Sequence, residues 1–209
     1  MDQEVITRTD LASATPLWLE TFVAQYQMFD TSRCPETILN VQRSNRWQES
    51  QTLGGLDKKS RDSRQVAYVS NAPPSEHEAF LGFASECLAD YLESRPEAAS
   101  LPRFECTEAY NIIHYPPGGA YHVAHSDYAP SPLHRNRHIS MVFFLNTIAE
   151  GGELEFVRQG LKVAPVEGRA VLFPTGWTHA HRSLPTAVDR YVIQMWWSFV
   201  EDAHGVESI

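Results

Sequence analysis

Five segments between residues 109 and 199 are rich in β-branched and aromatic residues: AYNIIHY (109–115), RHISMVFFLN (137–146), GELEF (152–156), RAVLFP (169–174) and RYVIQMWWSF (190–199). Gly- and Pro-containing sequences such as PPGG, EGG, VEG and PTG separate them. Short strands divided by such turns are typical of an all-β sandwich or barrel. Because strands and helices do not alternate, the pattern argues against a doubly wound sheet.

The N-terminal half carries helical patterns instead. A Thr-Pro start signal followed by apolar residues at helical spacing predicts a helix over residues 15–26. A capping box, Ser75 with Glu78, opens an amphipathic pattern that ends before Pro96 and predicts a second helix. The polar stretch between them, roughly residues 43–65, is predicted to be a loop with a short strand.

Length and composition set limits on the class of protein. A chain of 209 residues with 43% hydrophobic residues suits one globular domain, and we expect one spanning residues 1–209. We divide it into helical support and loops over 1–100 and a β core over 101–200. The formal net charge of −9 argues against nucleic acid and anionic membranes as partners.

The N-terminal sequence and the cysteines limit where the protein is expected and which kinds of site it can carry. The N-terminus lacks a signal-peptide pattern, and no apolar run is long enough to span a membrane, so we expect a cytoplasmic protein. The three cysteines, at positions 34, 87 and 106, are too few and too widely spaced for a disulfide framework or a cysteine zinc site. The oligomeric state is left open.

Nine histidines are present, and seven of them lie between residues 114 and 181. His125 and Asp127 are two residues apart, so on an extended strand both side chains point to the same side and can bind one metal ion. His179 and His181, after the segment RAVLFP, are the candidates for a third ligand. Two histidines and one carboxylate form the facial triad of non-heme Fe(II) oxygenases.

The order of motifs from residue 109 to 199 resembles the prolyl-4-hydroxylase-like branch of the Fe(II)/2-oxoglutarate dioxygenases. The matching residues, in chain order, are Tyr115-PPGGAYHVA-His125-S-Asp127, Arg137-HISMVFF-Leu145-Asn146, Gly151-Gly152-Glu153-Leu154-Glu155-Phe156, Phe173-Pro174, His181-RSL-Pro185 and Arg190. The match covers somewhat less than half of the chain. It implies a mostly β fold with N-terminal helices, in which a double-stranded β-helix (a jelly roll) forms the core. It also implies Fe(II), 2-oxoglutarate as cosubstrate, and O2.

The resemblance also selects the third metal ligand. In the family, Pro follows the distal histidine ligand by four residues, and a basic residue follows it by nine or ten. Counted from His181, these positions hold Pro185 and Arg190, whereas His179 satisfies neither spacing. The resemblance therefore implies His181, with the HxD pair, as the metal ligands.

Four further residues receive roles from the resemblance and from strand periodicity. Arg190 is expected to bind the distal carboxylate of 2-oxoglutarate, and Tyr115 to donate its hydroxyl to the same molecule. Period two puts Trp196 on the face of Arg190, where it helps to wall the pocket. This chain has Phe144 where several family members have a tyrosine. Asn111, on the strand face of Tyr115, is the candidate to supply that missing hydrogen bond.

The implied function is hydroxylation of an unactivated C–H bond, with succinate and CO2 as coproducts. The resemblance suggests a prolyl peptide, and a free amino acid or other small molecule is the second substrate class. The Asp ligand favours hydroxylation, since halogenases of the wider family replace it with a small residue. The alternative is a non-catalytic or different-metal β-barrel binding protein of the cupin type.

The remaining charged and histidine residues are expected to have ordinary roles. His114 should face away from the site, and His134 and His138 should lie on the surface. The basic cluster within 43–65 should be a solvated part of a loop that covers the site as a lid. Its members are Lys58, Lys59, Arg61 and Arg64.

Overall fold

A computed structural model of the chain describes residues 17–18, 22–28, 30–44, 46–68 and 74–200. The helices are α1 (Cys34–Arg43), α2 (Pro74–Ser94), α3 (Pro96–Ala99) and the 3-10 helix η2 (Trp177–His179). The strands are β1 (Leu17–Trp18), β2 (Ala24–Gln27), β3 (Gln48–Glu49), β4 (Arg64–Ala67), β5 (Phe104–Glu105), β6 (Asn111–Tyr115), β7 (Arg137–Phe144), β8 (Leu154–Phe156), β9 (Leu161–Val163), β10 (Arg169–Pro174), β11 (His181–Ser183) and β12 (Arg190–Phe199). All five strand segments predicted from the sequence are confirmed.

The strands form two antiparallel sheets. The larger has the order β1-β2-β10-β7-β12-β6-β4-β3, with β5 also paired to β12. The smaller has the order β11-β8-β9. In the centre of the larger sheet, from β2 to β4, no two neighbouring strands are consecutive in the sequence, which is how a jelly roll differs from a simple meander. The expected fold class, mostly β with a jelly-roll core and few helices, is confirmed.

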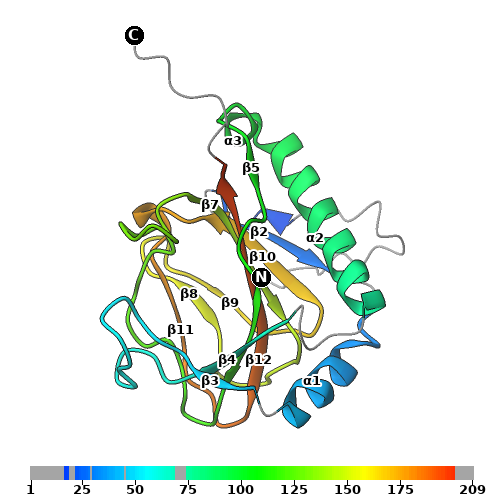
Figure 1. The fold of residues 1–209 in the computed structure, drawn as a ribbon, viewed down its shortest axis with the longest axis vertical. Coiled ribbons are helices and arrows are strands. Elements are labelled where there is room, and N and C mark those ends of the chain that lie inside the picture. Colours follow the sequence, from blue (N-terminus) through cyan, green and yellow to red (C-terminus); the bar gives the residue numbers. More distant parts are fainter. Residues whose placement is uncertain (1–16, 19–21, 29, 45, 69–73, 201–209) are drawn as a thin grey trace.

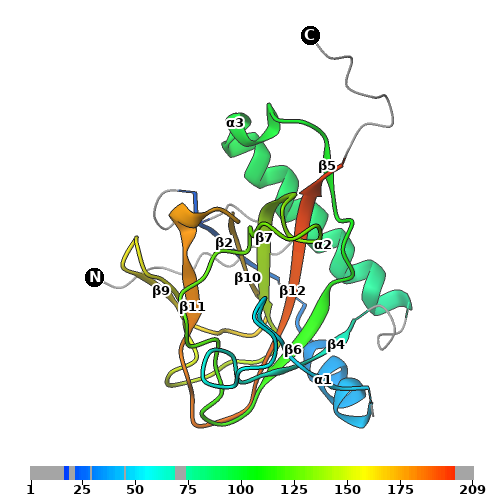
Figure 2. The same cartoon turned by 60° about the vertical axis from the view of Figure 1, so that its left-hand side comes forward.

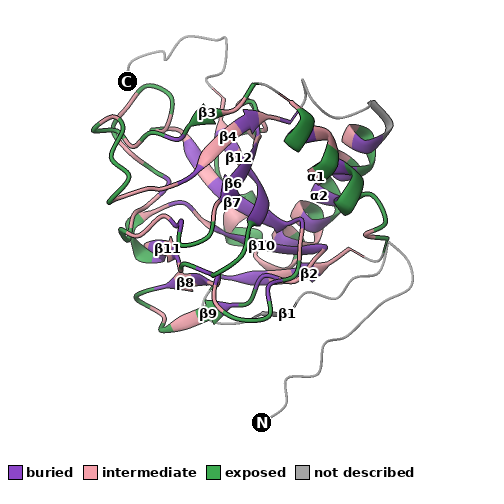
Figure 3. Cartoon of the chain, turned by 90° about the horizontal axis from the view of Figure 1, so that it is seen from below, coloured by how far each residue is buried: buried purple, intermediate pink, exposed green. Residues whose placement is uncertain are grey.

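The helices cover one face of the larger sheet, and the smaller sheet lies opposite its other face (Figures 1 and 2). Helix α2 buries an apolar side whose members recur every three or four residues: Phe80, Phe83, Ala84, Cys87 and Tyr91. Viewed from below, buried residues concentrate on the strands between the helices and the smaller sheet (Figure 3). No helix within the described ranges is long and apolar enough to cross a membrane.

Strand β12 serves both faces of the larger sheet. Tyr191, Ile193, Met195 and Trp197 belong to the core that includes α2. The alternate residues Arg190, Val192, Gln194 and Trp196 line a cavity between the sheets. The period-two assignment of this strand is therefore confirmed, and it decides which side chains reach the candidate site.

The helix predicted over residues 15–26 is wrong. Residues 24–27 form β2, which pairs with β10 in the register Leu172↔Ala24 to Arg169↔Gln27. Ala24 and Tyr26 are buried while Gln25 and Gln27 are half-buried, so the packing follows a period of two. Tertiary pairing has overridden the helical spacing here. Residues 15–16 and 19–21 lie outside the described residues.

The region from 30 to 67 contains one unpredicted element and one confirmed prediction. Helix α1, which was not predicted from the sequence, buries Cys34, Thr37 and Val41. The loop with a short strand predicted over 43–65 is confirmed, since that segment contains β3 and the start of β4, which pairs with β6 in the larger sheet. The capping box at Ser75 cannot be compared, since that side chain is outside the described set, but helix α2 begins at Pro74 and ends before Pro96 as expected.

His138 is packed between aromatic rings rather than exposed on the surface. Its ring centroid lies 4.8 Å from that of Phe104 and 4.7 Å from that of Phe199. Burial lowers the pKa of His138, although a hydrogen bond to the Ala98 carbonyl opposes that shift. The surface position predicted for it is therefore wrong.

This burial predicts a pH dependence of stability. An unfolded histidine has a pKa of about 6.5. Because the folded pKa is lower, the unfolded chain binds more protons, and stability is lost as the pH falls below that value. The melting temperature of the apoprotein should therefore fall between about pH 7.5 and about pH 5.5, and His138→Phe should reduce that fall. An identical pH dependence in the variant would contradict this.

Candidate metal and cosubstrate site

Three predicted ligands meet in one place. His125, Asp127 and His181 each offer a donor atom, and these atoms lie within 4.8 Å of one another. His125 Nε2 is 3.7 Å from Asp127 Oδ1, and His181 Nε2 is 3.8 Å from Asp127 Oδ2. Within the described part of the chain, no other group of three His, Cys, Asp or Glu residues is so arranged.

Backbone pairing brings the two histidines together. His125 and His181 form an isolated antiparallel bridge, with reciprocal N–H···O bonds of 2.9 Å. The Nδ1 atom of His125 contacts the carbonyl of Val123 at 3.2 Å, and that of His181 contacts the carbonyl of His179 at 3.0 Å. With Nδ1 engaged in this way, Nε2 of each ring is left as the metal-binding atom.

His179 lies outside the ligand cluster. It is buried at the end of η2, where its ring nitrogen contacts the Thr178 hydroxyl at 3.0 Å. Its backbone carbonyl orients His181 instead. The structure thus places His181, the histidine that the family spacing selects, in the ligand cluster. His179 supports it through its backbone carbonyl.

Protonation in the cluster suits metal binding. Burial opposes ionisation of Asp127, but its interactions with His181 and His125 and a hydrogen bond from Ser140 outweigh this and lower its pKa. Burial and the neighbouring His181 lower the pKa of His125. A charged carboxylate and neutral imidazole are the forms that coordinate metals, so the donor set fits Fe(II).

A chain of hydrogen bonds holds Asp127 from behind. The Ser140 hydroxyl donates to Asp127 Oδ2 over 2.6 Å, and Gln194 Nε2 donates to Ser140 Oγ over 2.9 Å. Ser140 is fully buried, so these bonds are shielded from water. These two hydrogen bonds orient the carboxylate of Asp127, and Ser140 bonds to Oδ2 and not to Oδ1.

Removal of this support should weaken metal binding. Ser140→Ala is expected to reduce Fe(II) affinity by about 10- to 100-fold, the usual cost of losing a hydrogen-bond partner of a ligand. The measurement is metal titration of the apoprotein under anaerobic conditions. Ser198→Ala is the matched control, because Ser198 is also buried but bonds to Glu108 over 3.3 Å. Equal affinities in the two variants would refute a positioning role for Ser140.

Arg190 is a buried cation that forms no ion pair with a carboxylate of the described residues. It is 2% exposed, and it donates from one terminal nitrogen to the carbonyl of Gly152, while its Nε has no partner. Its guanidinium carbon lies 4.1 Å from the centroid of Tyr115, the residue that it faces across β6. A buried unsatisfied guanidinium suits an anionic ligand, and its fork matches a carboxylate.

Gly152 is needed beside Arg190. Its φ of +76° is strained for any side chain, and a Cβ there would lie 3.4 Å from Arg190 Cδ. The Gly-Gly pair of the sequence motif therefore allows the backbone to approach the arginine closely and to present its carbonyl to the guanidinium.

The other predicted site residues line the same cavity. Tyr115 and Asn111 lie on β6, and Trp196 lies on β12, where the Arg137 guanidinium stacks over its ring at 3.5 Å. Phe144 also lines the cavity and offers no hydroxyl. His114 faces away as expected: its ring stacks on Tyr191 at 4.6 Å.

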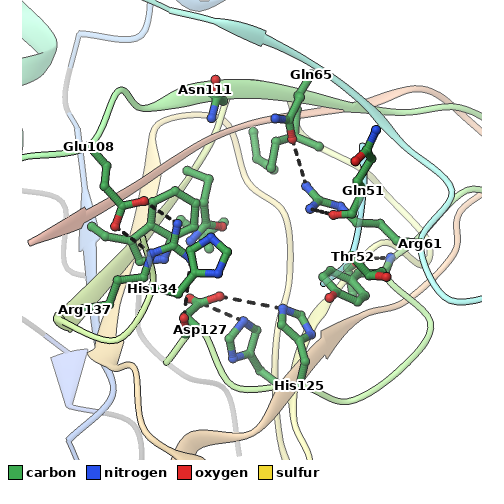
Figure 4. A pocket seen from close by; sticks show the side chains of 18 of the residues that line it. Gln51, Thr52, Arg61, Gln65, Glu108, Asn111, His125, Asp127, His134 and Arg137 are labelled. Carbon is green, nitrogen blue, oxygen red and sulfur yellow. Dashed lines mark hydrogen bonds and ion pairs between the residues drawn. The ribbon is translucent and has the colours of Figure 1, made fainter. Parts of the chain in front are cut away.

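The cavity has a volume of about 1100 Å³. Its far wall consists of residues from the 43–65 segment, which we call the lid wall: Gln48, Glu49, Gln51, Thr52, Leu53, Gly54, Arg61 and Gln65. Figure 4 shows Arg61 and Gln65 on one side of the pocket and Glu108 and Arg137 on the other, with the metal-cluster residues Asp127 and His125 at the bottom of the view.

Sequence reasoning missed several residues of this site. His134, which was predicted to lie on the surface, lines the cavity. Glu108 forms a buried ion pair with Arg137, whose Nε donates over 2.7 Å. Arg61 belongs to the pocket rather than to a solvated loop. One signal was readable, since Ser140 is the one hydroxyl in the otherwise apolar run from Ile139 to Phe144.

Comparisons with known proteins agree with this geometry. The sequence model of the 2OG-Fe(II) oxygenase superfamily matches residues 110–198. No curated protein sequence matches the chain at a significant level. Among solved structures, a prolyl hydroxylase from Trichoplax adhaerens, in complex with a hypoxia-inducible-factor peptide fragment, is similar with a TM-score of 0.67. It is 17% identical, over 84% of this chain and 83% of that one.

Two further structures have the same fold. A Pseudomonas putida prolyl-4-hydroxylase has a TM-score of 0.65 and 19% identity, covering 92% of this chain and 96% of its own. A viral collagen prolyl hydroxylase from Paramecium bursaria Chlorella virus-1, determined as a 2-oxoglutarate complex, has a TM-score of 0.61. It is 20% identical, over 86% of this chain and 97% of that one.

Proposed function

We propose that this Fe(II)- and 2-oxoglutarate-dependent dioxygenase hydroxylates an unactivated C–H bond. Its substrate is a prolyl peptide, a free amino acid or another small molecule. The match of residues 110–198 to the sequence model of the 2OG-Fe(II) oxygenase superfamily supports this proposal. The observation that carries this proposal is the His125, Asp127 and His181 cluster beside a buried arginine with an unsatisfied Nε. When bound, Fe(II) supplies the oxidative chemistry that converts 2-oxoglutarate and O2 to succinate and CO2 and hydroxylates the substrate.

Different residues of the chain position the metal and the cosubstrate. His125, Asp127 and His181 would hold the metal, and a facial triad of this kind would leave room for the cosubstrate and O2. Arg190 holds the distal carboxylate of 2-oxoglutarate, and Tyr115, stacked beneath its guanidinium, directs a hydroxyl to the same group. Asn111, which lies on the same strand as Tyr115, supplies the polar group that Phe144 lacks. Both Asn111 and Phe144 line the cavity.

Apolar side chains around this cavity keep water away from the reacting groups. Ile113, Val142, Phe144, Leu154 and Val192 are all buried and all line it. Trp196, held by its stack against Arg137, walls the side next to the metal cluster. Such a dry wall strengthens the electrostatic hold on the cosubstrate and protects the reaction from side paths.

Two measurements test this function. Under anaerobic conditions, Fe(II) with 2-oxoglutarate should produce a weak visible charge-transfer band, and a cupin-like binding protein should produce none. In air, the same mixture should release succinate, and a panel of free amino acids and proline-containing peptides should accelerate that release. A protein that gives neither the band nor succinate would be a binding protein and not an oxygenase.

A further inference from the structure

Three arginines line the cavity, and two of them already have a role. Arg190 faces the position proposed for the cosubstrate carboxylate. Arg137 is neutralised by Glu108, which it contacts through Nε and a terminal nitrogen. Arg61, in the lid wall, is the third. A cation in a substrate cavity with only neutral partners is a natural site for an anionic group.

The partners of the Arg61 guanidinium are uncharged. Its Nε donates to the Ser63 hydroxyl over 3.2 Å, and its two terminal nitrogens donate to the Gln51 carbonyl over 3.2 Å and to Gln65 Oε1 over 3.4 Å. A guanidinium has five N–H donors, and these contacts use three of them. The contacts orient the group without neutralising it, so donors remain for a ligand.

Arg61 is also held close to the metal cluster. It pairs with Tyr121 in an antiparallel bridge, and flanking backbone bonds of 2.8 Å join Asp62 to Ala120 and His122 to Ser60. The Arg61 guanidinium carbon lies 5.2 Å from the centroid of the Tyr121 ring. That ring stacks on His125 with centroids 3.6 Å apart. One aromatic ring therefore separates the guanidinium from a metal ligand.

Other cations of the lid wall region do not share this position. Lys58 is half exposed and pairs with Glu49 over 3.1 Å and with Asp62 over 3.4 Å. Lys59 is exposed and does not line the cavity. Arg64 contacts His114 and the Trp47 ring behind the sheet. The direction of Arg61 into the pocket, visible in Figure 4, distinguishes it from the rest of the basic cluster.

We propose that Arg61 binds a carboxylate of the substrate, so that this oxygenase acts on an acid: a free amino acid, or a residue at the carboxyl end of a peptide. This proposal rests on the proposed hydroxylase function and narrows its substrate class. The carboxylate binds at the lid wall, and the C–H bond to be hydroxylated lies between Arg61 and the metal cluster. Residues inside a peptide chain, Asp and Glu excepted, carry no carboxylate.

The test compares acids with their neutral counterparts. The holoenzyme, with Fe(II) and 2-oxoglutarate, is assayed for succinate release with every proteinogenic amino acid and its amide. A second arm uses N-acetylglycyl dipeptides with a free or an amidated carboxyl end. At least one acid should stimulate succinate release with a KM roughly 10- to 100-fold lower than that of its amide, the loss expected from removing one charge-assisted contact. The arm that responds identifies the source of the carboxylate.

Variants then assign the preference to Arg61. In Arg61→Gln the KM of the acid should rise until the difference between acid and amide disappears, and Arg61→Lys should fall between the two. The comparison of acid with amide within each variant cancels any general damage to the fold. Lys59→Gln removes a positive charge from the same loop and should leave the difference intact.

The outcomes separate this proposal from the function on which it rests. An acid–amide difference that persists in Arg61→Gln, or that is absent from the wild type, overturns the role of Arg61. So does an enzyme that releases succinate from 2-oxoglutarate alone but responds to no acid in either arm. Loss of both the visible band and all succinate release would instead remove the oxygenase function itself.

Discussion

Asp127→Ala is expected to reduce succinate formation by more than about 100-fold, because loss of a ligand should cost more than loss of a residue that supports one. Among the described residues, Asp127 is the one carboxylate of the metal cluster, and its side chain lies between both histidine rings. Its loss therefore removes the negative charge that this cluster offers to the metal. The measurements are Fe(II) affinity by anaerobic titration and succinate release in air.

Histidine variants supply the matched controls for this prediction. His125→Ala and His181→Ala should lose activity as Asp127→Ala does. His122→Ala changes a histidine three residues from His125 that does not line the cavity, and it should retain activity. His179→Gln distinguishes the two distal histidines: full loss there, with activity retained in His181→Ala, would reverse the assignment of the third ligand.

Arg190→Gln is expected to raise the KM for 2-oxoglutarate by roughly 100-fold or more. Two charge-assisted hydrogen bonds contribute roughly 1.5–3 kcal/mol each, and about 1.4 kcal/mol corresponds to a tenfold change. Arg190→Lys keeps the charge but loses the planar fork, so a smaller rise should follow. Fe(II) affinity without 2-oxoglutarate should change much less than the KM, since Arg190 does not contact the metal ligands.

Arg169 provides the control for burial of a guanidinium. It is 8% exposed, donates to the Ala164 carbonyl over 3.0 Å and does not line the cavity. Arg169→Lys should therefore lower stability without changing the KM for 2-oxoglutarate. If Arg190→Gln and Arg169→Lys gave the same KM, the cosubstrate would bind elsewhere.

The core of the site could be read from the sequence because its signals are local or have fixed spacing. Arg190 lies at a strand position whose two-residue period determines the direction of its side chain. The HxD pair was identified by its spacing, although His125 forms only an isolated bridge and Asp127 lies in a bend rather than on the expected strand. The distal histidine followed from two spacings, to Pro185 and Arg190. Alternation along RYVIQMWWSF likewise identified which residues face the helices and which face the cavity.

The remainder depends on contacts that no local pattern records. The apolar residues at 22–26 satisfy helical spacing, yet pairing with β10 makes residues 24–27 a strand. His134 follows a Pro-rich loop and looks exposed in the sequence, but the path of that loop takes it into the cavity. Lys59 and Arg61 have the same charge two residues apart, and only the bridge to Tyr121 separates a solvent-facing residue from one that lines the pocket.

The two-faced strand β12 has an evolutionary consequence. Insertion or deletion of one residue within it would exchange the cavity-facing set for the set that packs on α2, so a single frame slip would remove Arg190 from the site and unpack the core. Length changes in this strand should therefore be purged by selection. Residues 51–54 of the lid wall follow the short edge strand β3 and are mostly exposed, so extra residues there disturb little packing. Descendants of this enzyme can thus acquire new substrates by lengthening one surface segment while the oxidising machinery is inherited unchanged.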